Sequence, residues 1–218
     1  AEYVIKNVKT GIKEKNPAPP FTTSTLQQEA SRKLNFTTKR TMSVAQVLYE
    51  GVEIKGEGTL GLITYMRTDS LACKAFLNEN YPEYVPSYMP QYKSKNNAQD
   101  AHEAIRPTNV FLTPALVKDS LKPEQYKLYK LIWERFVASQ MAKAVYDTIN
   151  ADVDANGYIF KASGVKIKFA GFTKIYEEST DEAKQEETML PELCDGEKVL
   201  AKKIEPKQNF TAPPSRYT

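Results

Sequence analysis

The chain has 218 residues, of which 41% are hydrophobic and 26% are charged, close to the average of folded proteins. This composition excludes intrinsically disordered, collagen-like and disulfide-scaffold proteins, and no apolar run is long enough for a membrane span or a signal peptide. The formal net charge of +3 permits an anionic partner but does not by itself indicate one.

The first part of the chain predicts a strand, a break and two helices. Residues 2–8 have the pattern of a strand, and the proline-rich stretch 16–20 stops regular structure, as in a hinge or linker. Ser24 or Thr25 can cap a first helix, and the apolar spacing from Thr41 predicts a second. Helix-turn-helix DNA-binding proteins share this pattern, but two ordinary core helices explain it better.

The middle of the chain predicts a loop, a short strand and two further helices. The glycines between Gly51 and Gly58 indicate either a flexible gate element or a surface insertion. The apolar, β-branched run 60–67 favours a strand. Helices are expected over 98–106, where Pro107 helps to end the helix, and over 126–137, which is strongly amphipathic.

The last part of the chain changes to period-two alternation, which is typical of strands. Strands are expected at 145–153, 158–163, 165–169 and 198–204, with Asn156-Gly157 as a hairpin turn. The simplest architecture is α+β: residues 1–16 and 145–218 form a β domain, and residues 17–144 form a mainly helical domain inserted into it. Because the chain opens at Ala1 inside a predicted strand, we expect it to be part of a longer protein.

The numbers of histidine and cysteine residues exclude several kinds of metal and redox site. The single histidine, His102, excludes sites that need two imidazoles, and Cys73 and Cys194 are too far apart for a Cys-x-x-Cys motif. Two cysteines without a secretory signal fit a reducing compartment, so we expect a cytoplasmic protein. No glycine-rich phosphate loop occurs, which leaves a nucleotide-binding fold without support.

The motif His102-Glu103-Ala104-Ile105-Arg106 has an arginine where a zinc protease has its second histidine. On the predicted helix, His102 and Arg106 lie one turn apart on one face, which suits a phosphate or carboxylate. An ordinary exposed helix face is the alternative interpretation.

The segment 152–157 matches the first half of a calcium-binding EF-hand loop. Its twelfth position is Ser163, where a bidentate glutamate is required, and both flanks have strand patterns. Asp152 and Asp154 could also hold magnesium, but a solvated surface hairpin explains them better. We therefore expect no metal ligand in this chain.

The segment 64–70, which contains Tyr65 and Arg67, is richer in chemical groups than any other part of the chain. In a strand Tyr65 and Arg67 emerge on the same face, and an adjacent guanidinium favours the phenolate that a tyrosine nucleophile requires. A buried tyrosine beside a surface arginine is the alternative that the residues alone leave open.

Four segments closely resemble those of bacterial DNA topoisomerase I, a type IA enzyme, and they occur in the family's order. The resemblance covers essentially the whole chain, and its tyrosine and histidine motifs are highly specific. The segments are PFTTSTLQQEAS (20–31), GLITYMRTDS (61–70), AHEAIRPT (101–108) and FTAPPSRYT (210–218).

The resemblance implies a role for each candidate site residue. Tyr65 would be the nucleophile that cuts one DNA strand and holds its 5′-phosphate, and Arg67 would stabilise the charge on the scissile phosphate. His102 would be a DNA contact near the same phosphate. Arg106 is a weaker candidate for such a contact, and Asp69 would orient Arg67.

The resemblance also implies the architecture and the partners. The inserted helical domain would be winged-helix-like and the β pieces an arch, like domains III and II of these enzymes, with paired hinges near 17–20 and 144. The partner would be the single-stranded segment of negatively supercoiled DNA in the bacterial nucleoid. Mg²⁺ would be bound by a toprim domain that this chain lacks, so the chain alone would be inactive. A non-catalytic single-stranded DNA-binding or structural module is the alternative; a tyrosine recombinase would need more histidines and arginines.

Overall fold

The structure, a computed structural model, is an α+β fold with antiparallel sheets. By their contacts, the residues form two compact units: one comprises Ala1–Gly11, Thr148–Val165 and Glu187–Thr218, and the other Ile12–Asp147 and Lys166–Glu186. The division predicted from the sequence, 1–16 and 145–218 against 17–144, stays a prediction. The structure describes residues 2–64, 70–90, 92, 104–179, 190–206, 208 and 210.

A four-stranded sheet brings the first strand of the chain together with its last three strands, in the order β7-β6-β1-β8. The first strand of the chain, β1, extends well beyond residue 8, where the predicted strand ends. Strand β7 is continuous through Gly164, whereas two separate strands were predicted there. The last strand is only two residues long, shorter than the predicted 198–204. The strands are β1 (Tyr3–Lys15), β6 (Ala144–Ala155), β7 (Tyr158–Phe169) and β8 (Lys198–Val199).

The turn between β6 and β7 confirms the predicted hairpin. Asn156 and Gly157 both have positive φ, 55° and 92°, as a two-residue hairpin turn requires. The amide of Gly157 donates a hydrogen bond to Oδ1 of Asp154 over 2.7 Å, which closes the turn.

Two consecutive side chains of β1 reach the same face of the sheet, and the second of them has left-handed backbone. Asn7 has a φ of 55°, a left-handed conformation that asparagine tolerates. Lys6 Nζ lies 2.5 Å from Oδ2 of Asp154, and Asn7 Nδ2 donates to Oδ2 of Asp152 over 3.0 Å. Since Asp152 and Asp154 share one face of β6, Lys6 and Asn7 must face them together.

The second unit, Ile12–Asp147 and Lys166–Glu186, is called the helical unit below; its described residues form five α-helices, three 3₁₀ turns and two small two-stranded sheets. The strands β2 and β3 pair with each other, and β4 pairs with β5. The elements are α1 (Thr23–Leu34), α2 (Thr38–Glu50), β2 (Val52–Ile54), β3 (Gly58–Leu60), β4 (Ile63–Thr64), α3 (Ser70–Asn80), η1 (Pro82–Tyr84), β5 (Arg106–Pro107), α4 (Pro114–Val117), η2 (Lys118–Ser120), α5 (Pro123–Ser139) and η3 (Gly171–Lys174).

Local capping chemistry sets where the first two helices begin. Thr22, not Ser24 or Thr25, caps α1: its hydroxyl accepts from the amide of Thr25, whose hydroxyl in turn accepts from the amide of Thr22. Asn35 ends α1 in the left-handed conformation with φ 57°. Thr37 then caps α2, which begins at Thr38, three residues before the predicted start. The short link makes the two helices neighbours.

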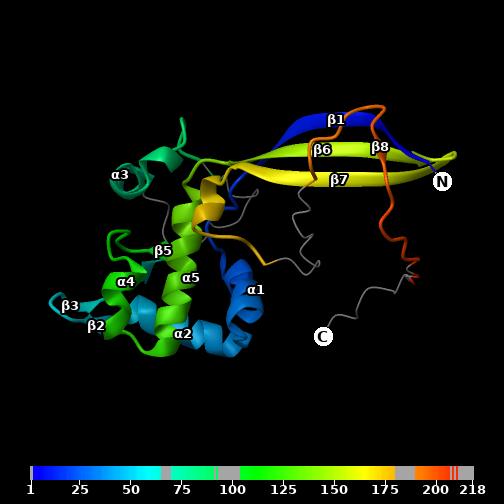
Figure 1. Cartoon of the computed structure of the whole chain (residues 1–218). Helices are drawn as coiled ribbons and strands as arrows, with labels where there is room; N and C mark the ends of the chain where they lie inside the picture. The colour runs from blue at the N-terminus through cyan, green and yellow to red at the C-terminus, as the bar shows by residue number, and fades with distance from the viewer. Residues whose placement is uncertain are drawn as a thin grey trace. The chain divides into compact units, whose positions relative to one another are not determined.

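The long helix α5 is the centre of the helical unit. It packs against α1, α2 and α4, and Figure 1 shows it running between them. Pro123 occupies the first turn, where a missing amide donor costs nothing, as predicted. Trp133 is buried and donates from Nε1 to the carbonyl oxygen of Val110 over 2.9 Å, so its polar atom is satisfied inside the core.

The glycine-bounded segment after α2 is an ordered hairpin, β2–β3. Val52 and Ile54 point into the core, and the amide of Lys55 donates to Oγ of Ser120 over 3.1 Å. These contacts hold β2 and the turn of the hairpin, where both Lys55 and the exposed Glu57 lie. Among the described residues, no helix is long and apolar enough to cross a membrane.

Candidate functional site

The strand β4 leads into residues 65–69, which are called the tyrosine segment below. This strand is short and is anchored to the rest of the fold. β4 consists of the buried Ile63 and of Thr64, the residue directly before Tyr65. It pairs antiparallel with β5, with Ile63 opposite Pro107 and Thr64 opposite Arg106. The chain therefore enters the tyrosine segment from a fixed position beside the segment that follows His102.

A third segment, just before α1, pairs with the chain next to this strand pair. Phe21, just before α1, forms an antiparallel bridge with Ile105, whose amide donates to the carbonyl oxygen of Phe21 over 2.7 Å. On the other side of β5, the amide of Thr108 donates to the carbonyl oxygen of Leu62 over 2.9 Å. Residues near 21, 62–64 and 105–108 thus meet in one place, although they are far apart in the sequence.

The helix α3 anchors the other end of the tyrosine segment. It begins at Ser70, and its side chains Cys73, Phe76 and Leu77 are buried. The ring of Phe76 meets that of Trp133 edge to face, with centroids 5.5 Å apart. Residues 65–69 are therefore bounded by an anchored strand before them and an anchored helix after them.

Four of the five candidate site residues lie outside the described residues: Tyr65, Arg67, Asp69 and His102. The fifth, Arg106, is half-buried and belongs to β5, so the prediction that it sits on a helix face one turn from His102 is wrong. The reason is Pro107, whose ring disfavours helical backbone at the preceding residue. Arg106 still approaches the tyrosine segment, but by pairing with Thr64 across a sheet.

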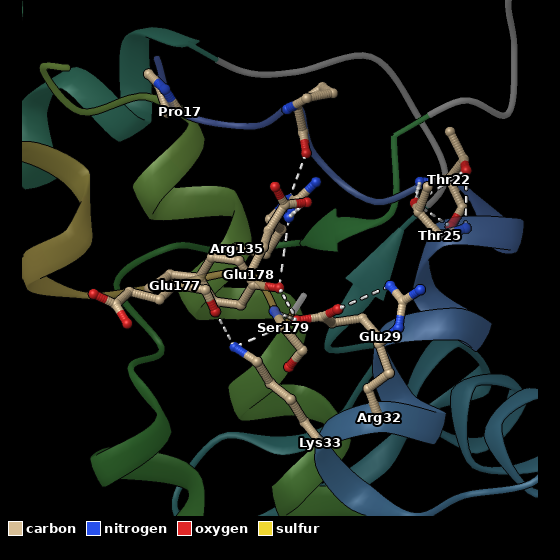
Figure 2. Close-up of polar contacts among 12 residues, drawn as sticks. Pro17, Thr22, Thr25, Glu29, Arg32, Lys33, Arg135, Glu177, Glu178 and Ser179 are labelled. Atoms are coloured by element: carbon tan, nitrogen blue, oxygen red, sulfur yellow. Dashed lines mark hydrogen bonds and ion pairs between the residues drawn. The ribbon is translucent and has the colours of Figure 1, made fainter. Parts of the chain in front are cut away.

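A buried polar network lies beside these segments. Arg135 of α5 is only 4% exposed; its Nε donates to the carbonyl oxygen of Pro19 and its Nη1 to Oε1 of Glu178, each over 2.6 Å. The guanidinium carbon lies 4.9 Å from the ring centroid of Phe21 and 5.3 Å from that of Tyr176. Figure 2 shows these polar contacts converging between α1 and α5.

Glu29 of α1 holds the same network from the other side. It is 4% exposed, and its Oε1 accepts from the hydroxyl of Tyr176 and from the amide of Ser179, each over 2.9 Å. Lys33 lies 3.4 Å from the same carboxylate and also donates to the carbonyl oxygen of Glu177. Burial raises the pKa of the Tyr176 hydroxyl, so this group remains a proton donor across the ordinary pH range.

Arg135 and Glu29 are not predicted as functional residues from the sequence, although the sequence contains a signal for Arg135. Arg135 follows Leu128 and Leu131 by seven and four residues, which places a charge on the apolar face of the helix. A charge at such a position must be paired when the helix is buried.

The acidic pair Asp152 and Asp154 does not fit a magnesium site. One carboxylate accepts from Asn7, and the other is held by Lys6 and the amide of Gly157. The lysine contact lowers the pKa of Asp154 by stabilising its charged form. Within the described ranges, no group of three or more histidine, cysteine, aspartate or glutamate residues could hold a metal ion.

A surface hollow of about 320 Å³ lies at the beginning of α2. Arg40 lines it, but Nε of this arginine donates to Oε2 of Glu124 over 3.2 Å, and Nη2 contacts the other carboxylate oxygen. The pair raises the pKa of Arg40 and lowers that of Glu124. The carboxylate therefore neutralises the guanidinium of Arg40, while Lys39 also lines the hollow.

Comparison with known proteins identifies close similarities over the whole chain. A family model described as DNA topoisomerase matches residues 1–218. Among solved structures, full-length topoisomerase I from Thermotoga maritima, in a monoclinic crystal form, matches with 38% sequence identity and a TM-score of 0.75. The match covers 91% of this chain and 32% of the Thermotoga chain, so the chain spans about a third of that protein's length.

Proposed function

Because this chain belongs to the bacterial type IA DNA topoisomerases, we propose that Tyr65 is the nucleophile that transiently cuts one DNA strand. The family match over residues 1–218 carries the proposal. The pairing of Thr64 with Arg106 supports it, because it brings the segment after His102 to the strand from which the tyrosine segment begins.

The proposed reaction exchanges one phosphodiester for another. The phenol oxygen of Tyr65 loses its proton and attacks phosphorus, and the bond from phosphorus to the 3′-oxygen of the neighbouring nucleotide breaks. The 3′-oxygen takes up a proton, and the 5′-phosphate stays on the tyrosine. Attack of the 3′-hydroxyl on that ester reverses each step, so strand passage relaxes negative supercoils without ATP.

The other candidate residues would act on the scissile phosphate. Arg67 would neutralise the charge that develops on its non-bridging oxygens, which is the main way in which proteins accelerate such transfers. Asp69 would orient Arg67, and His102 would contact the same phosphate. Arg106 would be a nearby DNA contact, presented by β5.

We also propose that the chain is the central part of a longer enzyme, since it spans about a third of the Thermotoga protein. Its strands would form an arch, and its helical part a winged-helix-like domain that lifts about hinges near 17–20 and 144. Small-angle scattering of the enzyme with and without DNA tests this movement, and identical profiles would count against it.

Mg²⁺ would be bound by a different part of that enzyme, because Asp152 and Asp154 already have partners. We therefore expect the 218-residue chain alone to bind single-stranded DNA weakly and not to cleave it. A covalent adduct of this chain with an oligonucleotide and Mg²⁺ would overturn that expectation. The working location would be the bacterial nucleoid.

The variant Tyr65→Phe in the longer enzyme separates this function from that of a non-catalytic DNA-binding module. Phenylalanine keeps the ring for stacking but has no oxygen to attack phosphorus. We expect oligonucleotide binding to be retained and the covalent adduct and relaxation to be abolished. Cleavage by Tyr65→Phe at the rate of the wild type would exclude Tyr65 as the nucleophile.

A further inference from the structure

We propose that Arg135 is a positioning residue for DNA cleavage, because its buried guanidinium fixes the segment on which β5 and β4 are built. The inference rests on the proposed function, since it concerns how accurately the tyrosine segment is placed. Arg135 would not touch DNA; it would act through Phe21 and Ile105.

The guanidinium of Arg135 holds the segment before α1 in two ways. Its Nε donates to the carbonyl oxygen of Pro19 over 2.6 Å, and its guanidinium carbon lies over the ring of Phe21, 4.9 Å from the ring centroid. Phe21 is itself buried, and the ring of Tyr176 meets it edge to face with centroids 6.4 Å apart. Both the backbone at residue 19 and the side chain at residue 21 are therefore fixed by one group.

The backbone of Phe21 passes this position on to the site. Its carbonyl oxygen accepts from the amide of Ile105, and the next residue, Arg106, pairs with Thr64. Thr64 directly precedes Tyr65 in the chain. Three residues, Phe21, Ile105 and Arg106, thus separate Arg135 from the residue before the proposed nucleophile. Ile105 and Arg106 are neighbours in the chain, and each other step is a packed contact or a strand pairing.

The geometry requires an arginine. The donors Nε and Nη1 bond to different acceptors, Pro19 and Glu178, while the guanidinium carbon lies over the ring of Phe21. A lysine carries the charge on a single atom, so it cannot satisfy both acceptors and cover the ring at once. Arg135→Lys should therefore loosen Pro19 and Phe21 while leaving a cation in place.

The segment that follows η3 has its own anchor, which allows a matched control. Glu29 accepts from Tyr176 and Ser179, so residues 176–179 do not depend on Arg135 alone. The Glu178 side chain is 45% exposed and can be hydrated. Glu178→Gln removes the charge opposite Arg135 but keeps an oxygen that can accept the same hydrogen bond.

The test compares Arg135→Lys and Glu178→Gln with the wild type in the longer enzyme. The rate of covalent adduct formation is measured in single turnover at saturating single-stranded oligonucleotide, together with oligonucleotide affinity and thermal unfolding. We expect Arg135→Lys, assayed well below its midpoint of unfolding, to cleave about 10- to 100-fold more slowly with affinity within about threefold of the wild type. Glu178→Gln should cleave within about threefold of the wild-type rate.

Three results would overturn the inference: an Arg135→Lys enzyme that cleaves at the wild-type rate, one that loses affinity as much as rate, or a Glu178→Gln enzyme that is equally slow. If Arg135→Lys does not fold, the cleavage rate and the affinity of the variant Phe21→Leu test the inference instead. This variant removes the ring under the guanidinium but keeps the backbone bond to Ile105, so it should slow cleavage without loss of affinity; an unchanged rate would contradict the inference. A wild-type enzyme that forms no adduct would instead contradict the proposed function on which the inference rests.

Discussion

The variant Gly61→Ala tests how closely the strand before the tyrosine segment approaches α2. Gly61 lies between β3 and β4, and a Cβ atom there would be 2.7 Å from the carbonyl oxygen of Tyr49. Ordinary contacts begin at 3.4 Å, so the two backbones would have to separate by about 0.7 Å. Both sides of the contact are main chain, which cannot rotate away as a side chain could.

The expected cost is that of overpacking, about 1–3 kcal/mol of unfolding free energy. The separation would also strain the adjacent hydrogen bond from the amide of Leu62 to the carbonyl oxygen of Leu48, now 2.8 Å long. Since Thr64 follows only three residues later, the tyrosine segment would be displaced with the strand. We expect single-turnover cleavage by the longer enzyme to fall about 10-fold or more, because small misplacements are costly in catalysis.

The assays are urea unfolding of the 218-residue chain, followed by circular dichroism, and covalent adduct formation by the longer enzyme. Gly56→Ala is the matched control, since Gly56 has a φ of 87° and open space around it. That variant should lose about 1 kcal/mol from backbone strain but cleave DNA normally. Gly61→Ala with wild-type stability and wild-type cleavage would refute the close approach to Tyr49.

Two further predictions concern hydrogen bonds in the helical unit. Trp133→Phe leaves the carbonyl oxygen of Val110 without its buried donor and should lower the unfolding free energy by about 1–3 kcal/mol in urea, followed by circular dichroism; an unchanged midpoint would contradict this. Tyr92→Phe removes the 2.7 Å bond to the carbonyl oxygen of Ser139 and should cost about 1 kcal/mol at neutral pH. Burial raises the pKa of Tyr92 to about 12, above the ordinary value of about 10, so its stabilisation is complete below about pH 10 and is lost as the pH rises towards 12. Thermal unfolding between pH 9 and 12 should therefore show the wild type converging on Tyr92→Phe, and parallel curves would contradict the assignment.

Local signals in the sequence were sufficient for the regular elements that carry them. Asn156-Gly157 predicts the hairpin because few other residues adopt positive φ, and Pro123 with the apolar spacing after it predicts α5. The spacing of Cys73, Phe76 and Leu77 is that of a buried helix face, but α3 was not predicted, because its polar residues obscure that pattern.

The arrangement of the site depends on long-range pairing, which the sequence does not display. β4 and β5 are two residues each, too short for any periodicity, and only their pairing places Arg106 beside Thr64. Arg106 does not lie on the expected helix, because Pro107 disfavours helical backbone at the residue before it, although the sequence around Arg106 has a helical pattern. The burial of Arg135 is likewise decided by the segments that meet around α5.

The most direct test of the proposed function is to identify the residue that becomes joined to DNA. The longer enzyme would be incubated with a labelled single-stranded oligonucleotide, denatured and digested, and the labelled peptide sequenced by mass spectrometry. We predict a peptide that contains Tyr65 linked to the 5′-phosphate. A labelled peptide from elsewhere, or a link to the 3′-phosphate, would contradict the assignment of this chain as the carrier of the cleaving tyrosine.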